Sequence, residues 1–212
     1  MNERKGGIQV DADIKNNLKQ SYNAHAYERE KNEMQEWKVK PRDTFLSLIK
    51  DESKVSLLEI GAGHGRDSKF FIENNLQVTA IDLSQEMVKL CTEKGIEAYE
   101  MDFYDLSKLN KKFDAVWALN CLLHVKKASL GLVLNEINNI LNPKGLFFMG
   151  VYGGEDKEGI WENDIYTPKR FFSFYTDDSI KEVVEEYFDI VSFKKIDSGG
   201  KYYFQSIILR KK

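Results

Sequence analysis

Three glycines at alternate positions, directly after an apolar stretch, constrain the fold of this chain more than any other feature. The apolar stretch covers residues 55–60, the glycines are Gly61, Gly63 and Gly65, and a helix-like segment follows over residues 67–75. Glycine adopts backbone angles that other residues avoid, and it lets a ligand approach the main chain closely. Open α/β sheets hold nucleotide-like ligands at such strand–loop–helix units. The sequence therefore predicts a ligand-binding loop in an α/β fold, with a tight turn that binds nothing as the plainer alternative.

The spacing of the loop separates two classes of cofactor. A dinucleotide fingerprint needs Gly-x-Gly-x-x-Gly, and Arg66 stands where its last glycine should be. Instead, Glu59 precedes Gly61 by two residues, which gives Glu-x-Gly-x-Gly-x-Gly over residues 59–65. This pattern resembles motif I of the class I S-adenosylmethionine (SAM) methyltransferases, in which the loop meets the methionine and ribose portions of SAM. A nicotinamide-dependent oxidoreductase remains the first alternative.

An acidic residue beyond the loop stands where a ribose would be bound. Asp82 ends a second apolar stretch, residues 77–82, about twenty residues after the loop, and an acid at this distance hydrogen-bonds ribose hydroxyls in dinucleotide-binding folds. Both cofactors require such an acid, so Asp82 indicates a ribose without choosing between them. Asp82 or Ser84 can also cap the helix that we expect over residues 84–94.

Three later segments extend the resemblance. Residues 96–101 are predicted to form a third strand, and the resemblance implies that Asp102 after it contacts the adenine amino group, with Phe103 at the ring; a simple turn residue is the alternative. Residues 112–119 open with a Phe-Asp pair that is common in the family, and residues 141–149 contain a Leu-Asn-Pro-Lys-Gly turn similar to the family's turn into strand five. The order and spacing of these segments together carry the resemblance.

Alternating strands and helices predict a mainly parallel sheet with helices on both faces. Helices are expected around residues 67–75, 84–94, 127–141 and 177–187. Residues 188–196 and 201–210 are predicted to be strands, and the Asp-Ser-Gly-Gly turn between them indicates an antiparallel hairpin. A terminal hairpin is unusual in dinucleotide-binding folds. It resembles the methyltransferase sheet, so we expect an α/β, Rossmann-like doubly wound, mostly parallel seven-stranded sheet with an antiparallel C-terminal hairpin.

Length and composition fit a single domain over residues 1–212. The chain is 42% hydrophobic, enough for a core, and 31% charged. Residues 1–10 are expected to be a loose tail, residues 11–50 an N-terminal helical cap with a break near Pro41, and residues 53–212 the α/β core.

The charge and the cysteines limit the expected partners and location. A net charge of −3 provides no electrostatic footprint for nucleic acid. Cys91 and Cys121 have no spacing that indicates a disulfide or a zinc site, which is consistent with a reducing cytoplasm. The first residues lack the apolar core of a signal peptide, and no run of about twenty apolar residues predicts a membrane span. We expect a cytoplasmic monomer or homodimer that binds no metal, nucleic acid or membrane.

Several polar and aromatic residues are candidates for contacts with the cofactor or the substrate. His124 follows the fourth predicted strand, where the neighbouring segment usually lines the site in similar proteins, so it is a candidate substrate contact or base; a packed residue is the alternative. Tyr22 and Tyr27 lie in the helical cap, where aromatic rings can attract a sulfonium. Arg42 is a candidate partner for the cofactor's carboxylate, with a surface salt bridge as the alternative.

Residues 152–176 form a long connection after the fifth predicted strand, and such connections are often functional lids. Tyr152, Trp161 and Arg170 are candidate walls of an acceptor pocket, and Lys169 with Arg170 would attract an anionic acceptor. Packing of the aromatic residues onto the body is the alternative.

The resemblance implies a SAM-dependent methyltransferase that transfers a methyl group to a nitrogen, oxygen or sulfur nucleophile of a small molecule. Such transfer works mainly by proximity and orientation. The cofactor-site residues it implies are Tyr22, Tyr27, Arg42, Glu59, Gly61, Ala62, Gly63, Asp82, Leu83, Met87, Asp102, Phe103 and Asn120. A non-catalytic SAM-binding regulatory protein is the second alternative, because binding and turnover use the same loop.

Overall fold

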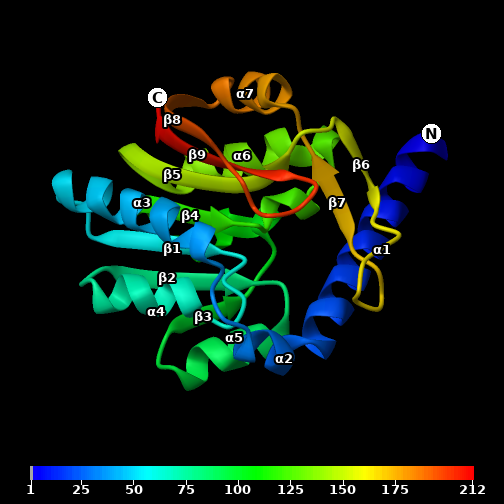
Figure 1. Ribbon diagram of the computed structural model, residues 1–212, viewed down its shortest axis with the longest axis horizontal. Coiled ribbons are helices and arrows are strands. Elements are labelled where there is room, and N and C mark those ends of the chain that lie inside the picture. Colours follow the sequence, from blue (N-terminus) through cyan, green and yellow to red (C-terminus); the bar gives the residue numbers. More distant parts are fainter. Residues whose placement is uncertain (1) are drawn as a thin grey trace.

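The computed structural model describes the backbone of residues 2–212 and the side chains from Ala12 onward. Within this part, a seven-stranded sheet has the strand order β3-β2-β1-β4-β5-β9-β8, with helices on both faces (Figure 1). Its strands are β1 (Ser56–Ile60), β2 (Gln77–Asp82), β3 (Glu97–Glu100), β4 (Phe113–Leu119), β5 (Leu141–Gly153), β8 (Phe188–Ile196) and β9 (Tyr203–Lys211). β1 to β5 are parallel, and β9 runs antiparallel to both β5 and β8. The predicted Rossmann-like sheet with a C-terminal antiparallel hairpin is confirmed.

Successive side chains of each strand point to opposite faces of the sheet, so each face has its own core. Leu57 belongs to the core cluster that includes residues of α3 (Val39–Asp51) and α4 (Arg66–Glu73). The next residue, Leu58, belongs to the cluster that includes residues of α6 (Lys127–Ile140) and α7 (Asp177–Glu185). The other helical elements between the strands are α5 (Gln85–Glu93) and the 3-10 segments η2 (Phe103–Leu109) and η3 (Leu122–His124).

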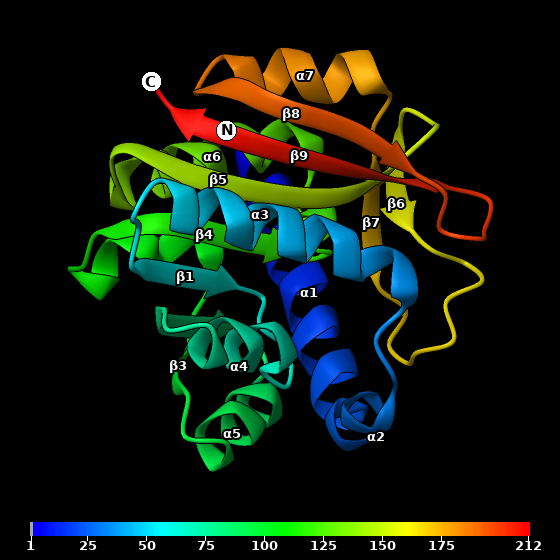
Figure 2. The ribbon, with the colours of Figure 1, turned by 60° about the vertical axis from the view of Figure 1, so that its left-hand side comes forward.

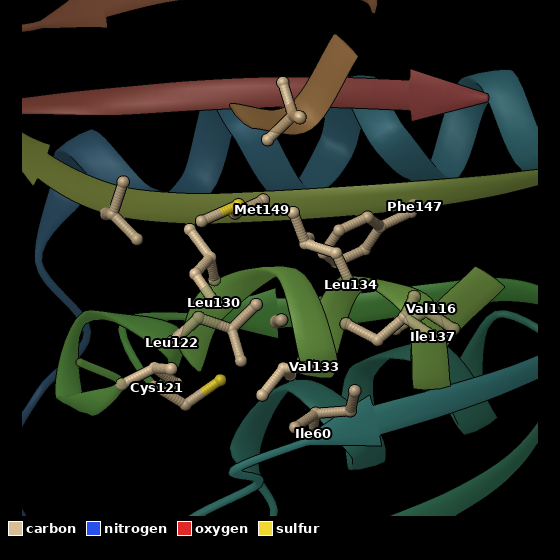
Figure 3. Close-up of a cluster of buried hydrophobic side chains, with 14 of the residues drawn as sticks. Ile60, Val116, Cys121, Leu122, Leu130, Val133, Leu134, Ile137, Phe147 and Met149 are labelled. Carbon is tan, nitrogen blue, oxygen red and sulfur yellow. The ribbon is translucent and has the colours of Figure 1, made fainter. Parts of the chain in front are cut away.

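The larger core lies between the sheet and α6 (Figure 3). In α6, four apolar residues recur at the spacing that forms one face of a helix. They are Leu130, Val133, Leu134 and Ile137, and they face Ile60, Val116, Phe147 and Met149 of the strands. This packing fixes the carboxyl ends of β1 and β4, where the glycine loop begins.

The N-terminal segment differs from the expectation at its start. α1 (Asn2–Ala24) begins at Asn2, so the loose tail expected for residues 1–10 is wrong. After α2 (Ala26–Lys31) and the short η1 (Glu36–Lys38), α3 begins at Val39. The break expected near Val39-Lys40-Pro41 falls at the boundary between η1 and α3. Pro41 itself lies in the first turn of α3, where its missing N–H leaves no helical hydrogen bond unmade. Among the described residues, no helix has the length and hydropathy needed to cross a membrane.

The connection after β5 contains a second, two-stranded sheet. β6 (Lys157–Ile160) pairs antiparallel with β7 (Phe171–Phe174). β7 lies beside α1 in both views of the ribbon (Figures 1 and 2). Phe172 and Phe174 are buried in the larger core, so the segment packs firmly onto the body.

Candidate active site

A cavity of about 650 Å³ lies at the carboxyl ends of β1, β2 and β4. These strand ends contribute Ile60, Asp82 and Leu119 to its wall, and α1 closes it with Leu18 and Tyr22. α1 lies at this edge of the sheet (Figure 1). The volume falls within the range of small-molecule sites, and open α/β sheets bind ligands at this edge.

The three glycines of the loop serve different needs. All have positive φ, at +66° for Gly61, +57° for Gly63 and +82° for Gly65. A Cβ on Gly61 would lie 2.4 Å from the Cβ of Cys121, and a Cβ on Gly65 would lie 2.9 Å from the Sγ of Cys91. A Cβ on Gly63 would meet nothing within 4 Å. The outer two glycines therefore allow close packing, whereas Gly63 leaves space through which a ligand can reach the backbone.

Asp82 is fixed at the end of β2 by two backbone amides. Its Oδ2 accepts from the Gly63 amide at 2.8 Å, and its Oδ1 accepts from the Ser84 amide at 2.8 Å. Burial raises the pKa of Asp82, although these hydrogen bonds act in the opposite direction. Ser84 itself caps α5 by accepting from the Met87 amide, so the capping role falls to Ser84. Each carboxylate oxygen of Asp82 can accept a further hydrogen bond from a ligand hydroxyl.

A second acid stands on the other side of the cavity. Asp102 accepts from the Tyr104 amide at 3.2 Å and caps η2. Its other oxygen pairs with Lys15 of α1. Met101 and Phe103 line the cavity on either side of Asp102. The Lys15 pair therefore ties α1 to this end of the cavity.

Glu59 and Asp67 form a buried acidic pair beneath the glycine loop. Burial, with the charge of Asp67 as the next cause, raises the pKa of Glu59 well above its usual value. Glu59 accepts a hydrogen bond from the Ser68 hydroxyl. Asp67 accepts from Arg42 at 3.2 Å and from the Trp117 indole at 3.1 Å. Arg42 thus neutralises Asp67.

The cation that lines this end of the cavity is Lys38 rather than Arg42. The Arg42 guanidinium lies 3.7 Å from the centre of the Phe70 ring, and Arg42 is absent from the cavity wall. Lys38, one helical turn earlier, lines the cavity and is half-buried. Burial lowers the pKa of Lys38 to about 8. Lys38 was not predicted from the sequence, because nothing in its neighbourhood distinguishes it from other lysines of the segment.

His124 is held as a neutral hydrogen-bond acceptor. Its Nδ1 lies 2.7 Å from the Phe171 carbonyl oxygen, which can only accept, so Nδ1 carries the proton. Its Nε2 accepts from the Tyr22 hydroxyl at 2.6 Å. Burial lowers the pKa of His124 to about 3, and the charges of Arg170 and Arg29 act in the same direction. His124 therefore positions Tyr22 and is poorly suited to take up a proton.

The other predicted residues divide between the cavity wall and the surrounding structure. The wall includes Tyr22, Glu59, Gly61, Ala62, Gly63, Asp82, Leu83, Met87, Asp102, Phe103, Asn120 and His124. Tyr27 is 47% exposed and lies outside the wall. Tyr152 packs against Phe204, and Trp161 packs in the aromatic cluster of β7; neither lines the cavity. Arg170 pairs with Asp164 at 2.8 Å and reaches the wall only through Tyr22, to whose oxygen it donates at 3.1 Å.

Asn120 has an unsatisfied polar atom at the cavity. Its Oδ1 is buried and has no hydrogen-bond partner, and its φ is +56°. A buried acceptor without a partner costs free energy, so a ligand that donates a hydrogen bond here is favoured. Among the described side chains, no group of three or more His, Cys, Asp or Glu residues is placed to hold a metal ion.

Comparisons with known proteins agree with this geometry. Residues 57–145 match the family model of the methyltransferase domain. An uncharacterized methyltransferase of Oceanobacillus iheyensis is 23% identical over 167 residues, which cover 73% of this chain and 78% of the relative. A ubiquinone biosynthesis O-methyltransferase of Xanthomonas oryzae is 28% identical over 112 residues, 50% of this chain and 46% of the relative, so the match spans about half of each protein.

Among solved structures, the 1,6-didemethyltoxoflavin-N1-methyltransferase of Burkholderia thailandensis is similar over nearly the whole chain. It superposes with a TM-score of 0.72 at 19% identity, covering 96% of this chain and 89% of that protein. That crystal structure contains 1,6-didemethyltoxoflavin and S-adenosylhomocysteine. Residues 57–145 therefore match the model of the methyltransferase domain, and they lie within a chain that has the class I methyltransferase fold.

Proposed function

We propose that this protein is a SAM-dependent methyltransferase that acts on a nitrogen, oxygen or sulfur nucleophile of a small molecule. The observation that carries the proposal is the meeting of Gly63, Asp82, Asp102 and Asn120 on one cavity at the carboxyl edge of the sheet. The match of residues 57–145 to the methyltransferase-domain model and the S-adenosylhomocysteine in the similar Burkholderia structure support it.

The residues of the cavity fit the parts of SAM. Asp82 would accept from the ribose hydroxyls, and Asp102 from the adenine amino group. The space beside Gly63 admits the methionine portion, and the unpaired Oδ1 of Asn120 offers an acceptor to a hydrogen-bond donor of the cofactor. Lys38 would pair with the methionine carboxylate, because it is a half-buried cation with no carboxylate partner among the described residues.

The chain contributes orientation rather than proton transfer. SAM, when bound, supplies a methyl group on an electrophilic sulfonium. α1 and Tyr22 cover the cavity, and covering a site holds the reactants in position and excludes water. Because His124 is held neutral and its pKa is near 3, it is a weak base. The arrangement therefore suits an acceptor that arrives as a neutral amine or as an anion, neither of which needs a strong base.

Calorimetric titration with SAM, S-adenosylhomocysteine and NADH tests the cofactor. We expect both adenosyl ligands to bind and NADH not to bind. Asp82→Asn should weaken adenosyl binding at least tenfold, because it removes the charge from the ribose acceptor. Asp178→Asn, an exposed acid on α7, is the matched control and should bind like the native protein. Binding of NADH alone would indicate an oxidoreductase.

A methyl-transfer assay separates the enzyme from the regulatory alternative. The protein is incubated with SAM and a panel of small amines, phenols, carboxylates and thiols, and S-adenosylhomocysteine is measured. We expect release of S-adenosylhomocysteine with at least one acceptor and none without an acceptor. Tight SAM binding with no transfer to any member of the panel would instead favour a SAM-binding regulatory protein.

A further inference from the structure

Acids and cations both line the cavity, but three of its cations have no ion-pair partner in the described part of the chain. Arg29, Lys38 and Arg66 all line the cavity, and none has a carboxylate within ion-pair distance among the described side chains. Arg66 donates to the backbone carbonyl of Asn32. Burial lowers the pKa of Lys38, and the charges of Arg29 and Arg66 add to this effect, which indicates that the three cations repel one another. Anions that enter the cavity would relieve this repulsion.

The lid cations that the sequence analysis singled out are already neutralised. Lys169 pairs with Glu162 at 2.9 Å, and Arg170 pairs with Asp164 at 2.8 Å. Neither residue lines the cavity. The charge available to an anionic ligand therefore comes from the cations of the cavity wall.

The proposed cofactor cannot satisfy all of these cations. SAM has one carboxylate, together with an ammonium and a sulfonium, so it brings net positive charge. Lys38 faces Asp67 at the glycine-loop end of the cavity, since the charge of Asp67 raises its pKa, and it accounts for the cofactor's carboxylate. Arg29 remains.

Arg29 lies on the Tyr22 side of the cavity. Its guanidinium carbon is 5.2 Å from the centre of the Tyr22 ring, and its Nη1 donates to the Tyr166 hydroxyl at 3.0 Å. A guanidinium has five N–H donors. The bond to Tyr166 uses one of them, so the others can meet a planar anion in the cavity.

We propose that the methyl acceptor carries a carboxylate and that Arg29 binds this group. A guanidinium matches a carboxylate with two parallel hydrogen bonds, which a neutral amide cannot equal. This inference rests on the proposed function, because it names the substrate class of the same site. It makes Arg29 a specificity-determining residue for an anionic small molecule.

Paired probes of equal shape test the inference. The protein is saturated with S-adenosylhomocysteine, and each probe is added while NMR chemical-shift changes report its affinity. The pairs are benzoate and benzamide, cinnamate and cinnamamide, and indole-3-acetate and indole-3-acetamide. We expect at least one carboxylate to bind about tenfold or more tightly than its amide. Arg29→Gln should abolish this preference, Arg29→Lys should retain part of it, and the control Lys169→Gln should retain all of it.

The outcomes separate this inference from the proposed function. If S-adenosylhomocysteine fails to bind the native protein, the proposed function fails. If it binds while every carboxylate binds no better than its amide, only the present inference is overturned. A carboxylate preference that survives Arg29→Gln would also overturn the inference, whether or not this variant loses affinity for S-adenosylhomocysteine. The melting temperature of each variant verifies that it is folded.

Discussion

Replacement of Lys38 by Met should make the free protein more stable while weakening its proposed cofactor binding. A methionine keeps the apolar stem of the lysine and removes the charge. The pKa of Lys38 falls from 10.5 to about 8 on folding, and at about 1.4 kcal/mol per pKa unit this corresponds to about 3 kcal/mol. Lys38 is only half-buried and water screens its charge, so we expect about 1–3 kcal/mol.

The lowered pKa of Lys38 also makes the stability gain depend on pH. Below pH 8, Lys38 is charged in both the folded and the unfolded chain, and the whole cost of burying the charge is present. Between pH 8 and pH 10.5 the folded chain releases the proton first, so stability rises with pH and the cost fades. Lys38→Met should therefore raise the melting temperature by roughly 2–10 °C at pH 7, and this gain should shrink towards pH 10.

Thermal unfolding at pH 7 and pH 10, followed by circular dichroism, measures the stability change, and calorimetry measures S-adenosylhomocysteine binding. We expect the affinity to fall about tenfold or more, because a charge-assisted contact is lost. Lys40→Met, which removes an exposed cation from the first turn of α3, should change neither quantity. A destabilised Lys38→Met at pH 7, or an unchanged affinity, would refute the reasoning.

Three further perturbations probe the loop, the sheet and the cover. Gly61→Ala should lower stability by at least about 2 kcal/mol in urea unfolding, because its Cβ meets Cys121, whereas Gly63→Ala should cost about 1 kcal/mol and mainly weaken S-adenosylhomocysteine binding. Burial opposes ionisation of Asp114, but hydrogen bonds outweigh this effect and lower the pKa of Asp114 to about 2. The ionised carboxylate therefore stabilises the fold above pH 4, and this stabilisation is lost from pH 4 to pH 2. Asp114→Asn should lower the free energy of unfolding in urea less at pH 2 than at pH 7. Tyr22→Phe, which breaks the link to His124, should speed amide hydrogen exchange in α1 while leaving exchange in the sheet unchanged.

The parts of the site that are local in sequence could be predicted. Gly61, Gly63 and Asp82 belong to two neighbouring parallel strands, and the carboxyl ends of such strands meet at one edge, so the pattern alone brings them together. The hairpin of β8 and β9 was also predictable, because its turn residues and its alternating strands agree.

Residues whose position depends on packing could not be predicted. Arg29 and Lys38 reach the cavity because α2 and η1 fold back across the strand ends, and no local pattern encodes that path. Arg42 is diverted from the cavity by Asp67, a partner 25 residues away in sequence. Trp161 was predicted at a pocket wall because a long connection without periodicity suggests a lid, whereas β6 and β7 pair and bury their aromatic side chains.

The contacts that hold α1 over the cavity make its closure sensitive to ionic strength. Lys15 pairs with Asp102, Lys19 pairs with Glu100, and both lysines are at least one-third exposed. At physiological ionic strength, attraction between exposed charges is screened beyond about 8 Å, and added salt screens it further. We therefore expect the helix to lift more often as salt is added. Ligand entry would then accelerate with salt, the reverse of the slowing seen when opposite charges steer an encounter.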